Sequence, residues 1–193
     1  MLTQAQYTKG LRDLGFLGST GAMVANFQRG WNLGTALVVD GKYGPKTDAA
    51  LSLSLTRMRG GKPTASANFS FREYKCKCNG RYSTCLGVWV LRGHLARMEA
   101  ARRKLARPIS IVSGCRCPSY NKSVGGASNS QHLYGVANDV SWPSYTVVKG
   151  WRLFAGIGYK RATSATLHVD SRDLGGHNTT RGTTTAPTIW VYA

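Results

Sequence analysis

The sequence predicts an α+β protein, in which a small three-helix module precedes a mixed domain built on a small antiparallel sheet. Three observations lead to this prediction. Apolar residues recur at helical spacing within residues 1–55. The stretch 56–67 is rich in Gly, Pro, Ser and Thr and lacks periodicity, which is typical of a linker. Residues 68–193 combine one amphipathic helix with several short alternating segments, which are typical of strands.

The first 55 residues contain three helical signals. Apolar residues from Leu2 to Leu14 follow a helical stripe, and Gly15 follows as a stop signal. A second helix is predicted around residues 21–30. Turn dipeptides at Asp40-Gly41 and Gly44-Pro45 then precede a third helix, which Thr47 can cap.

The same segment contains Phe27-Gln28, the run from Val39 to Thr47, and Ala50-Leu51. With these residues it resembles the three-helix peptidoglycan-binding module found on many cell-wall hydrolases. It departs from that family at residues 30–34, so the position of a ligand groove stays open. The resemblance implies a wall-binding module at residues 1–55, and the alternative is a plain three-helix bundle.

Residues 68–193 alternate between helix and strand patterns. Ser70 and Glu73 form a capping box that predicts a short helix. An apolar stripe over residues 88–106 predicts the clearest helix, whose His94 we expect at the surface or core edge rather than on a metal. Strands are predicted by the patterns at 108–113, 136–142 and 166–171.

The net charge of +18 points to a polyanionic partner, and nucleic acid, anionic lipid and an anionic cell wall all fit. Residues 68–193 carry +13 of it and contain only five carboxylates. No apolar run is long enough to span a membrane. The first residues lack the apolar core of a secretory signal, so we expect synthesis in a cytoplasm and action elsewhere after release.

Five cysteines lie between residues 76 and 117, including the pairs Cys76-Lys-Cys78 and Cys115-Arg-Cys117. These C-x-C pairs differ from the C-x-x-C pairs usual in zinc ribbons. Three states stay open for them: a structural zinc site, one or two disulfides formed after release, and buried free thiols.

A second group of residues carries metal-binding chemistry. His132 and Asp139 can share an ion only if a loop folds back over the strand that carries Asp139, and Gly135 permits that turn. His168 and Asp170 are two residues apart, so on a strand they share a face. Two histidines and an aspartate form a three-ligand zinc site with an open position, which suits hydrolysis.

Four motifs surround these residues: Ser130-x-His132-x-x-Gly135-x-Ala137-x-Asp139, Ser113-Gly114-Cys115-Arg116, Asn121 with Gly125-Gly126, and the downstream His168-Val169-Asp170. With these motifs, residues 68–175 resemble the zinc D-alanyl-D-alanine carboxypeptidases of the M15 type, and most of all their phage-endolysin members. The resemblance implies that His132, Asp139 and His168 hold zinc. It also implies that Arg116 faces the substrate carbonyl or carboxylate and that Ser130 helps to hold the substrate.

One position departs from the family pattern. Several branches place the catalytic carboxylate three residues before the last histidine, where this chain has Ala165. Asp170 is the nearest remaining candidate for a general base that accepts a proton from the attacking water. The alternative role for Asp170 is to support a ligand histidine through a hydrogen bond. The sequence leaves both roles open and slightly favours the base.

These features together predict a zinc peptidase of the endolysin kind that cuts a stem peptide or cross-link of bacterial peptidoglycan. Anionic wall polymers are a further expected partner. The D-Ala–D-Ala, D-Ala–diaminopimelate and L-Ala–D-Glu bonds all stay open as the scissile bond. A non-enzymatic wall-binding protein with a vestigial zinc site is the alternative, motivated by Ala165. A nucleic-acid-binding zinc protein is disfavoured, because no nucleic-acid motif is present.

Overall fold

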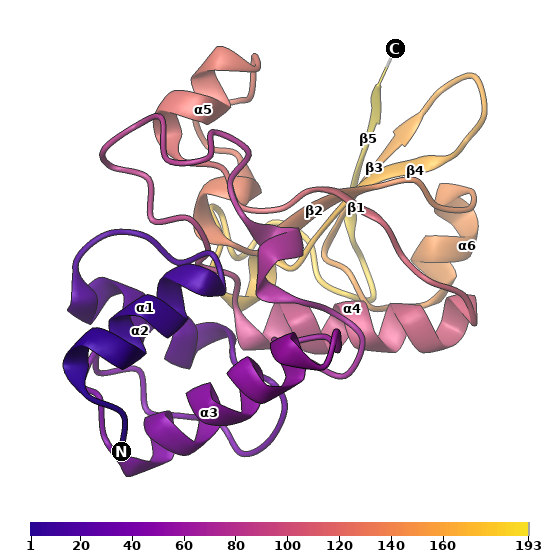
Figure 1. Cartoon of the computed structure of the whole chain (residues 1–193). Coiled ribbons are helices and arrows are strands. Elements are labelled where there is room, and N and C mark those ends of the chain that lie inside the picture. Colours follow the sequence, from indigo (N-terminus) through magenta and orange to yellow (C-terminus); the bar gives the residue numbers. More distant parts are fainter. Residues whose placement is uncertain (193) are drawn as a thin grey trace.

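The computed structural model describes residues 1–192, and its N-terminal part is helical (Figure 1). Helices α1 (Gln4–Asp13), α2 (Thr20–Gly30) and α3 (Pro45–Arg59) form a group in which α1 contacts both others. Thr3 caps α1 through a complete capping box, and Pro45 occupies the first turn of α3, where its missing N–H costs nothing. No helix among the described residues is long and apolar enough to cross a membrane.

Gln28 organises the loop between α2 and α3. Its buried side chain donates to the Asp40 carboxylate at 2.9 Å and accepts from the backbone N–H of Gly41 at 3.0 Å. It also donates to the Thr47 hydroxyl at 3.2 Å. These polar groups therefore satisfy one another's hydrogen bonds inside the module, so Gln28 and Asp40-Gly41 have a structural role.

The segment predicted as a linker, 56–67, is packed in the structure. Helix α3 continues to Arg59, and Ala65 and Ser66 are fully buried. The buried Glu99 on α4 (Arg92–Leu105) accepts hydrogen bonds at 2.7 Å from the Ser66 hydroxyl and from the backbone N–H of Asn68. Residues 66–68 are thus anchored to the following domain by the carboxylate of Glu99.

The mixed α+β class is confirmed by a five-stranded sheet in the order β1-β2-β4-β3-β5. Neighbouring strands are antiparallel, except that β5 runs parallel to β3. The expectation of a wholly antiparallel sheet is therefore wrong at this edge. The last residue of β4, Asp170, and the first residue of β5, Thr188, both pair with Gly156, the first residue of β3. Because β5 starts at the end of the sheet where β3 also starts, the two strands run parallel. The strands are β1 (Ile111–Ser113), β2 (Ala137–Val140), β3 (Gly156–Lys160), β4 (Thr166–Asp170) and β5 (Thr188–Tyr192).

Short helical segments join these strands. They are η1 (Phe71–Tyr74), α5 (Pro118–Ser123), η2 (Gln131–Tyr134), α6 (Tyr145–Gly150) and η3 (Arg172–Leu174). The helix predicted over 88–106 begins only at Arg92, because Val88, Trp89 and Val90 form a buried extended stretch before it.

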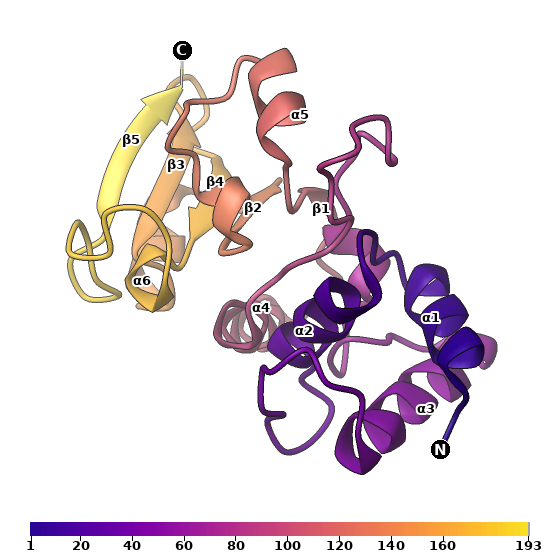
Figure 2. The ribbon, with the colours of Figure 1, turned by 90° about the vertical axis from the view of Figure 1, so that its left-hand side faces the viewer.

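Helix α4 lies between the N-terminal helices and the sheet (Figure 2). On one side the Arg92 guanidinium donates to the carbonyl of Trp31 at 2.7 Å. On the other, His94 is fully buried and bonds Ser171 at 2.9 Å and Asn138 at 2.6 Å. Burial lowers the pKa of His94 to about 4, so this histidine is a neutral core residue and lies deeper than the sequence predicted.

Candidate metal centre

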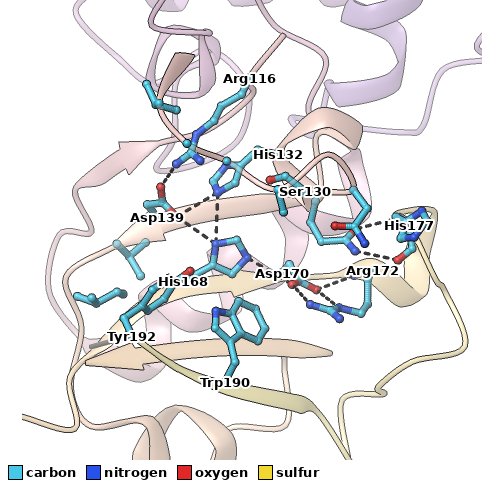
Figure 3. Close-up of a pocket in the computed structure, with 18 of the residues that line it drawn as sticks. Arg116, Ser130, His132, Asp139, His168, Asp170, Arg172, His177, Trp190 and Tyr192 are labelled. Carbon is cyan, nitrogen blue, oxygen red and sulfur yellow. Dashed lines mark hydrogen bonds and ion pairs between the residues drawn. The ribbon is translucent and has the colours of Figure 1, made fainter. Parts of the chain in front are cut away.

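Three side chains converge at the centre of the sheet: His132 from η2, Asp139 from β2 and His168 from β4 (Figure 3). One donor atom from each lies within 4.8 Å of the other two. Asp139 and His168 are direct partners in the antiparallel register of β2 and β4, which brings them together. Gly135 ends η2 with a φ of 70°, and this left-handed turn folds the loop with His132 back over β2.

Each histidine is oriented by a hydrogen bond on the ring nitrogen that faces away from the centre. His132 Nδ1 donates to the carbonyl oxygen of Gly114 at 2.6 Å. His168 Nε2 lies 3.3 Å from the Asp170 carboxylate. The two inward nitrogens, His132 Nε2 and His168 Nδ1, lie 3.3 Å apart and each is 3.0 Å from Asp139 Oδ1. Outer partners of this kind fix the tautomer and leave a lone pair for a metal.

The electrostatics of the three donors suit a cation. Burial alone would raise the pKa of Asp139, but hydrogen bonds with His132 and His168 hold it well below its usual range. Burial lowers the pKa of His132, which favours a neutral imidazole. Burial also acts on His168, but its bonds to the two aspartates outweigh it and raise the pKa. At neutral pH the centre therefore presents one carboxylate and at least one neutral imidazole.

Asp170 lies behind His168 and away from the other two donors (Figure 3). Its side chain is fully buried, and Arg172 holds both oxygens at 2.9 and 2.7 Å. Burial opposes ionisation, but the bonds from Arg172 and His168 lower the pKa of Asp170 far below its usual value. A carboxylate so strongly held as an anion, on the outer nitrogen of a histidine, is placed to orient that histidine. These contacts support the second of the two roles that the sequence left open, and the general-base role stays a prediction to be tested.

Arg116 and Ser130 lie at the same centre. The Arg116 guanidinium forms an ion pair with Asp139 and donates to the Ser113 hydroxyl at 2.9 Å. The backbone N–H of Arg116 also bonds the carbonyl of His132 at 3.1 Å, so the arginine segment and the histidine loop hold each other. Ser130 directly precedes η2, and it lines the cavity above the centre together with Arg116.

The three donors open onto a cavity of about 770 Å³. Its wall includes residues that sequence reasoning missed: Arg172, His177, Trp190 and Tyr192. Trp190 and Tyr192 are two residues apart on β5 and share a face, so the alternating segment Thr188-Ile-Trp-Val-Tyr192 was the signal for them. The Arg172 guanidinium lies 5.4 Å from the Trp190 ring centroid, which adds a cation–π contact to the wall.

The donor set fits zinc. Imidazole nitrogens and a carboxylate oxygen are its common ligands, and three protein ligands beside a cavity leave a coordination position open. The other two histidines, His94 and His177, belong to no group of metal donors within residues 1–192.

Comparisons with known proteins agree with this site. Residues 67–170 match the Peptidase M15 family, a range that contains all three donors and Arg116 but ends before β5. The zinc D-Ala-D-Ala carboxypeptidase of Streptomyces albus G is 28% identical over 131 aligned residues, covering 55% of this chain. The chain spans about half the length of that relative, 51%. The expected zinc cofactor is confirmed by the family, the relative and the donor set, and the chain belongs to the peptidase M15 family.

Proposed function

We propose that this protein is a zinc-dependent peptidase that hydrolyses an amide bond in the peptide part of bacterial peptidoglycan. The observation that carries the proposal is the set His132, Asp139 and His168, oriented from behind and open to one cavity. Membership of the M15 family supports the reaction type, and the relative from Streptomyces albus G supports the substrate class.

The chain's own residues provide binding, orientation and charge. His132, Asp139 and His168 would hold the zinc ion, which when bound would supply Lewis-acid chemistry for water activation and for the scissile carbonyl. Arg116 has five N–H donors, and its contacts with Ser113 and Asp139 leave others for an oxyanion or a substrate carboxylate. Ser130 offers a hydroxyl at the cavity wall, and Trp190 offers an apolar surface for the peptide.

Asp170 acts in this proposal as a positioning residue. It accepts the outer N–H of His168, so the inner nitrogen keeps its lone pair toward the metal. Arg172 neutralises the carboxylate and fixes its direction through two hydrogen bonds. The pair therefore acts on the orientation of His168 and accepts no proton from the attacking water. Ala165, which forms an isolated β-bridge with Ser144 directly before β4, has no acid–base role.

We further propose that the protein acts as an endolysin, made in a host cytoplasm and released onto the wall. The net charge of +18 favours contact with an anionic wall. The resemblance of residues 1–55 to a peptidoglycan-binding module favours tethering, which raises the local substrate concentration.

The test is mass spectrometry of fragments released from purified peptidoglycan of defined stem peptide by the zinc-loaded full chain. We expect new amine and carboxyl ends at one type of peptide bond, which also identifies that bond. The matched control is His132→Ala in the same preparation. Binding to intact walls without any new ends would overturn the peptidase and favour the wall-binding alternative.

A further inference from the structure

A second cluster of donor atoms lies outside the cavity, and its members are four of the five cysteines. The Sγ atoms of Cys76, Cys78, Cys85 and Cys117 all lie within 4.8 Å of one another. All four residues are at most 8% exposed, and all five thiols of the chain are free. The fifth, Cys115, lies outside the cluster, and its sulfur instead accepts the backbone N–H of Trp89 at 3.4 Å.

The spacing of the sulfurs matches a tetrahedral metal site. Four sulfurs about 2.3 Å from a zinc ion lie about 3.8 Å from one another. Cys78 Sγ and Cys117 Sγ are 3.8 Å apart. Four mutually close thiols also leave no position for a fifth ligand, which is the arrangement of closed, structural zinc sites.

The backbone around the cluster is shaped to hold thiolates. Backbone N–H groups point at sulfur in two places, from Gly87 to Cys85 Sγ and from Cys117 to Cys76 Sγ, each at 3.4 Å. Asn79 and Gly80 adopt left-handed φ values of 53° and 85°, which turn the chain sharply just after Cys78. The N–H groups that point at sulfur stabilise negative charge at the sulfur atoms.

We propose that Cys76, Cys78, Cys85 and Cys117 bind a second, structural zinc ion. This site is separate from the His132–Asp139–His168 centre and shares no residue with it. It gives the loop over residues 75–87 a reason to be ordered, because that loop contains no helix or strand. Of the three states that the sequence left open for the cysteines, this proposal assigns metal binding to the four clustered ones and a free thiol to Cys115.

The proposed ion also stabilises the catalytic face. Cys117 is the last residue of a short segment in which Gly114 accepts from His132 and Arg116 pairs with Asp139. Binding Cys117 and the loop over 75–87 to one ion anchors the C-terminal end of this segment. The two metal sites therefore hold the same stretch of chain between them.

The first experiment counts zinc in full chains that are expressed with zinc and purified with a reductant. We expect two zinc ions per wild-type chain. The double variant His132→Ala/His168→Ala should retain one, which can come only from the cysteines, so this result does not depend on the proposed peptidase. Cys78→Ser/Cys117→Ser should lose one, and the control Cys115→Ser should keep both. Zinc-free His132→Ala/His168→Ala protein with the folded far-UV spectrum would overturn the site.

A second measurement avoids cysteine variants, which can fail to fold. Cobalt should replace zinc in the His132→Ala/His168→Ala chain and give the intense thiolate-to-cobalt absorption of a tetrahedral sulfur site. A mercurial reagent should then release one metal ion as it titrates the thiols. Thiols that titrate without metal release, or an intact mass that shows disulfides in the reductant-purified protein, would contradict the proposal.

Discussion

The His132–Asp139–His168 centre and the four-cysteine cluster both involve the short segment 114–117 and differ in what surrounds them. The first has three donors and opens onto a cavity, whereas the second has four donors and is buried on all sides. Zinc sites that perform chemistry keep an open position, and zinc sites that hold a fold do not. The comparison teaches that donor number and exposure are what separate the two roles proposed for these sites.

The two regions also differ in how charge is balanced. In the open centre, Arg116 pairs with Asp139 and Arg172 pairs with Asp170, so each carboxylate has its own guanidinium. In the cysteine cluster the sulfurs receive backbone N–H groups instead. Side-chain cations can turn toward a substrate, while backbone donors cannot. The open centre is therefore the region where single substitutions should change turnover most.

The largest expected effect comes from removing a donor of the open centre. His168→Ala should abolish hydrolysis to the background rate, because the site then has two donors and loses zinc affinity. Zinc content by elemental analysis and turnover of defined peptidoglycan check this. Far-UV circular dichroism should stay that of the wild type, since the cysteine cluster is untouched. Turnover near wild type in a zinc-free sample would break the comparison.

Replacing Arg116 should have the next largest effect. Arg116→Ala should lower kcat by roughly 10²–10³, the usual cost of losing one donor to a developing oxyanion. Zinc content should change little, because Arg116 is not a donor to the metal. The matched control is Arg181→Ala, since Arg181 also lines the cavity but is exposed and makes no ion pair in the described chain. Equal losses for both arginines would argue for general electrostatic attraction instead.

Asp170→Asn separates positioning from base catalysis. The amide keeps the size of the side chain but loses the charge that orients His168, so zinc affinity should fall about 10–100-fold. A zinc titration read by turnover should then recover near wild-type kcat at saturation. A loss of roughly 10²–10⁴ that persists with zinc bound would restore the general-base role. Arg172→Gln is the companion variant, because it weakens the same orientation without touching the carboxylate.

The three donors expected from the sequence lie together in the structure, partly because of local geometry and partly because β2 pairs with β4. His168 and Asp170 are two residues apart on a strand, and Gly135 supplies the turn that returns His132. The wall formed by Trp190 and Tyr192 was missed, because it depends on the non-local pairing of β5 with β3. The alternation of residues 188–192 could have indicated the strand, but not that it pairs with β3 beside the centre.

The composition of residues 56–67 did not indicate that part of this segment is buried. Small and polar residues are typical of linkers, yet Ser66 is buried because the distant Glu99 accepts its hydroxyl. The two C-x-C pairs were equally ambiguous. Cys117 precedes α5 and turns toward the cluster, while Cys115 stays in the core beside Trp89. Only the tertiary structure distinguishes four clustered thiols from a fifth that is alone.

That fifth thiol gives the smallest expected effect and the sharpest check on the comparison. Cys115→Ala removes one buried sulfur that accepts only the Trp89 N–H, so the free energy of unfolding should fall by about 1 kcal/mol. Zinc content and turnover should equal those of the wild type. Cys117→Ala, two residues away and of the same size change, should instead lose one zinc and unfold at markedly lower urea. If the two variants behave alike in urea unfolding and zinc analysis, the four thiols are ordinary core residues, and the contrast between an open and a closed site fails.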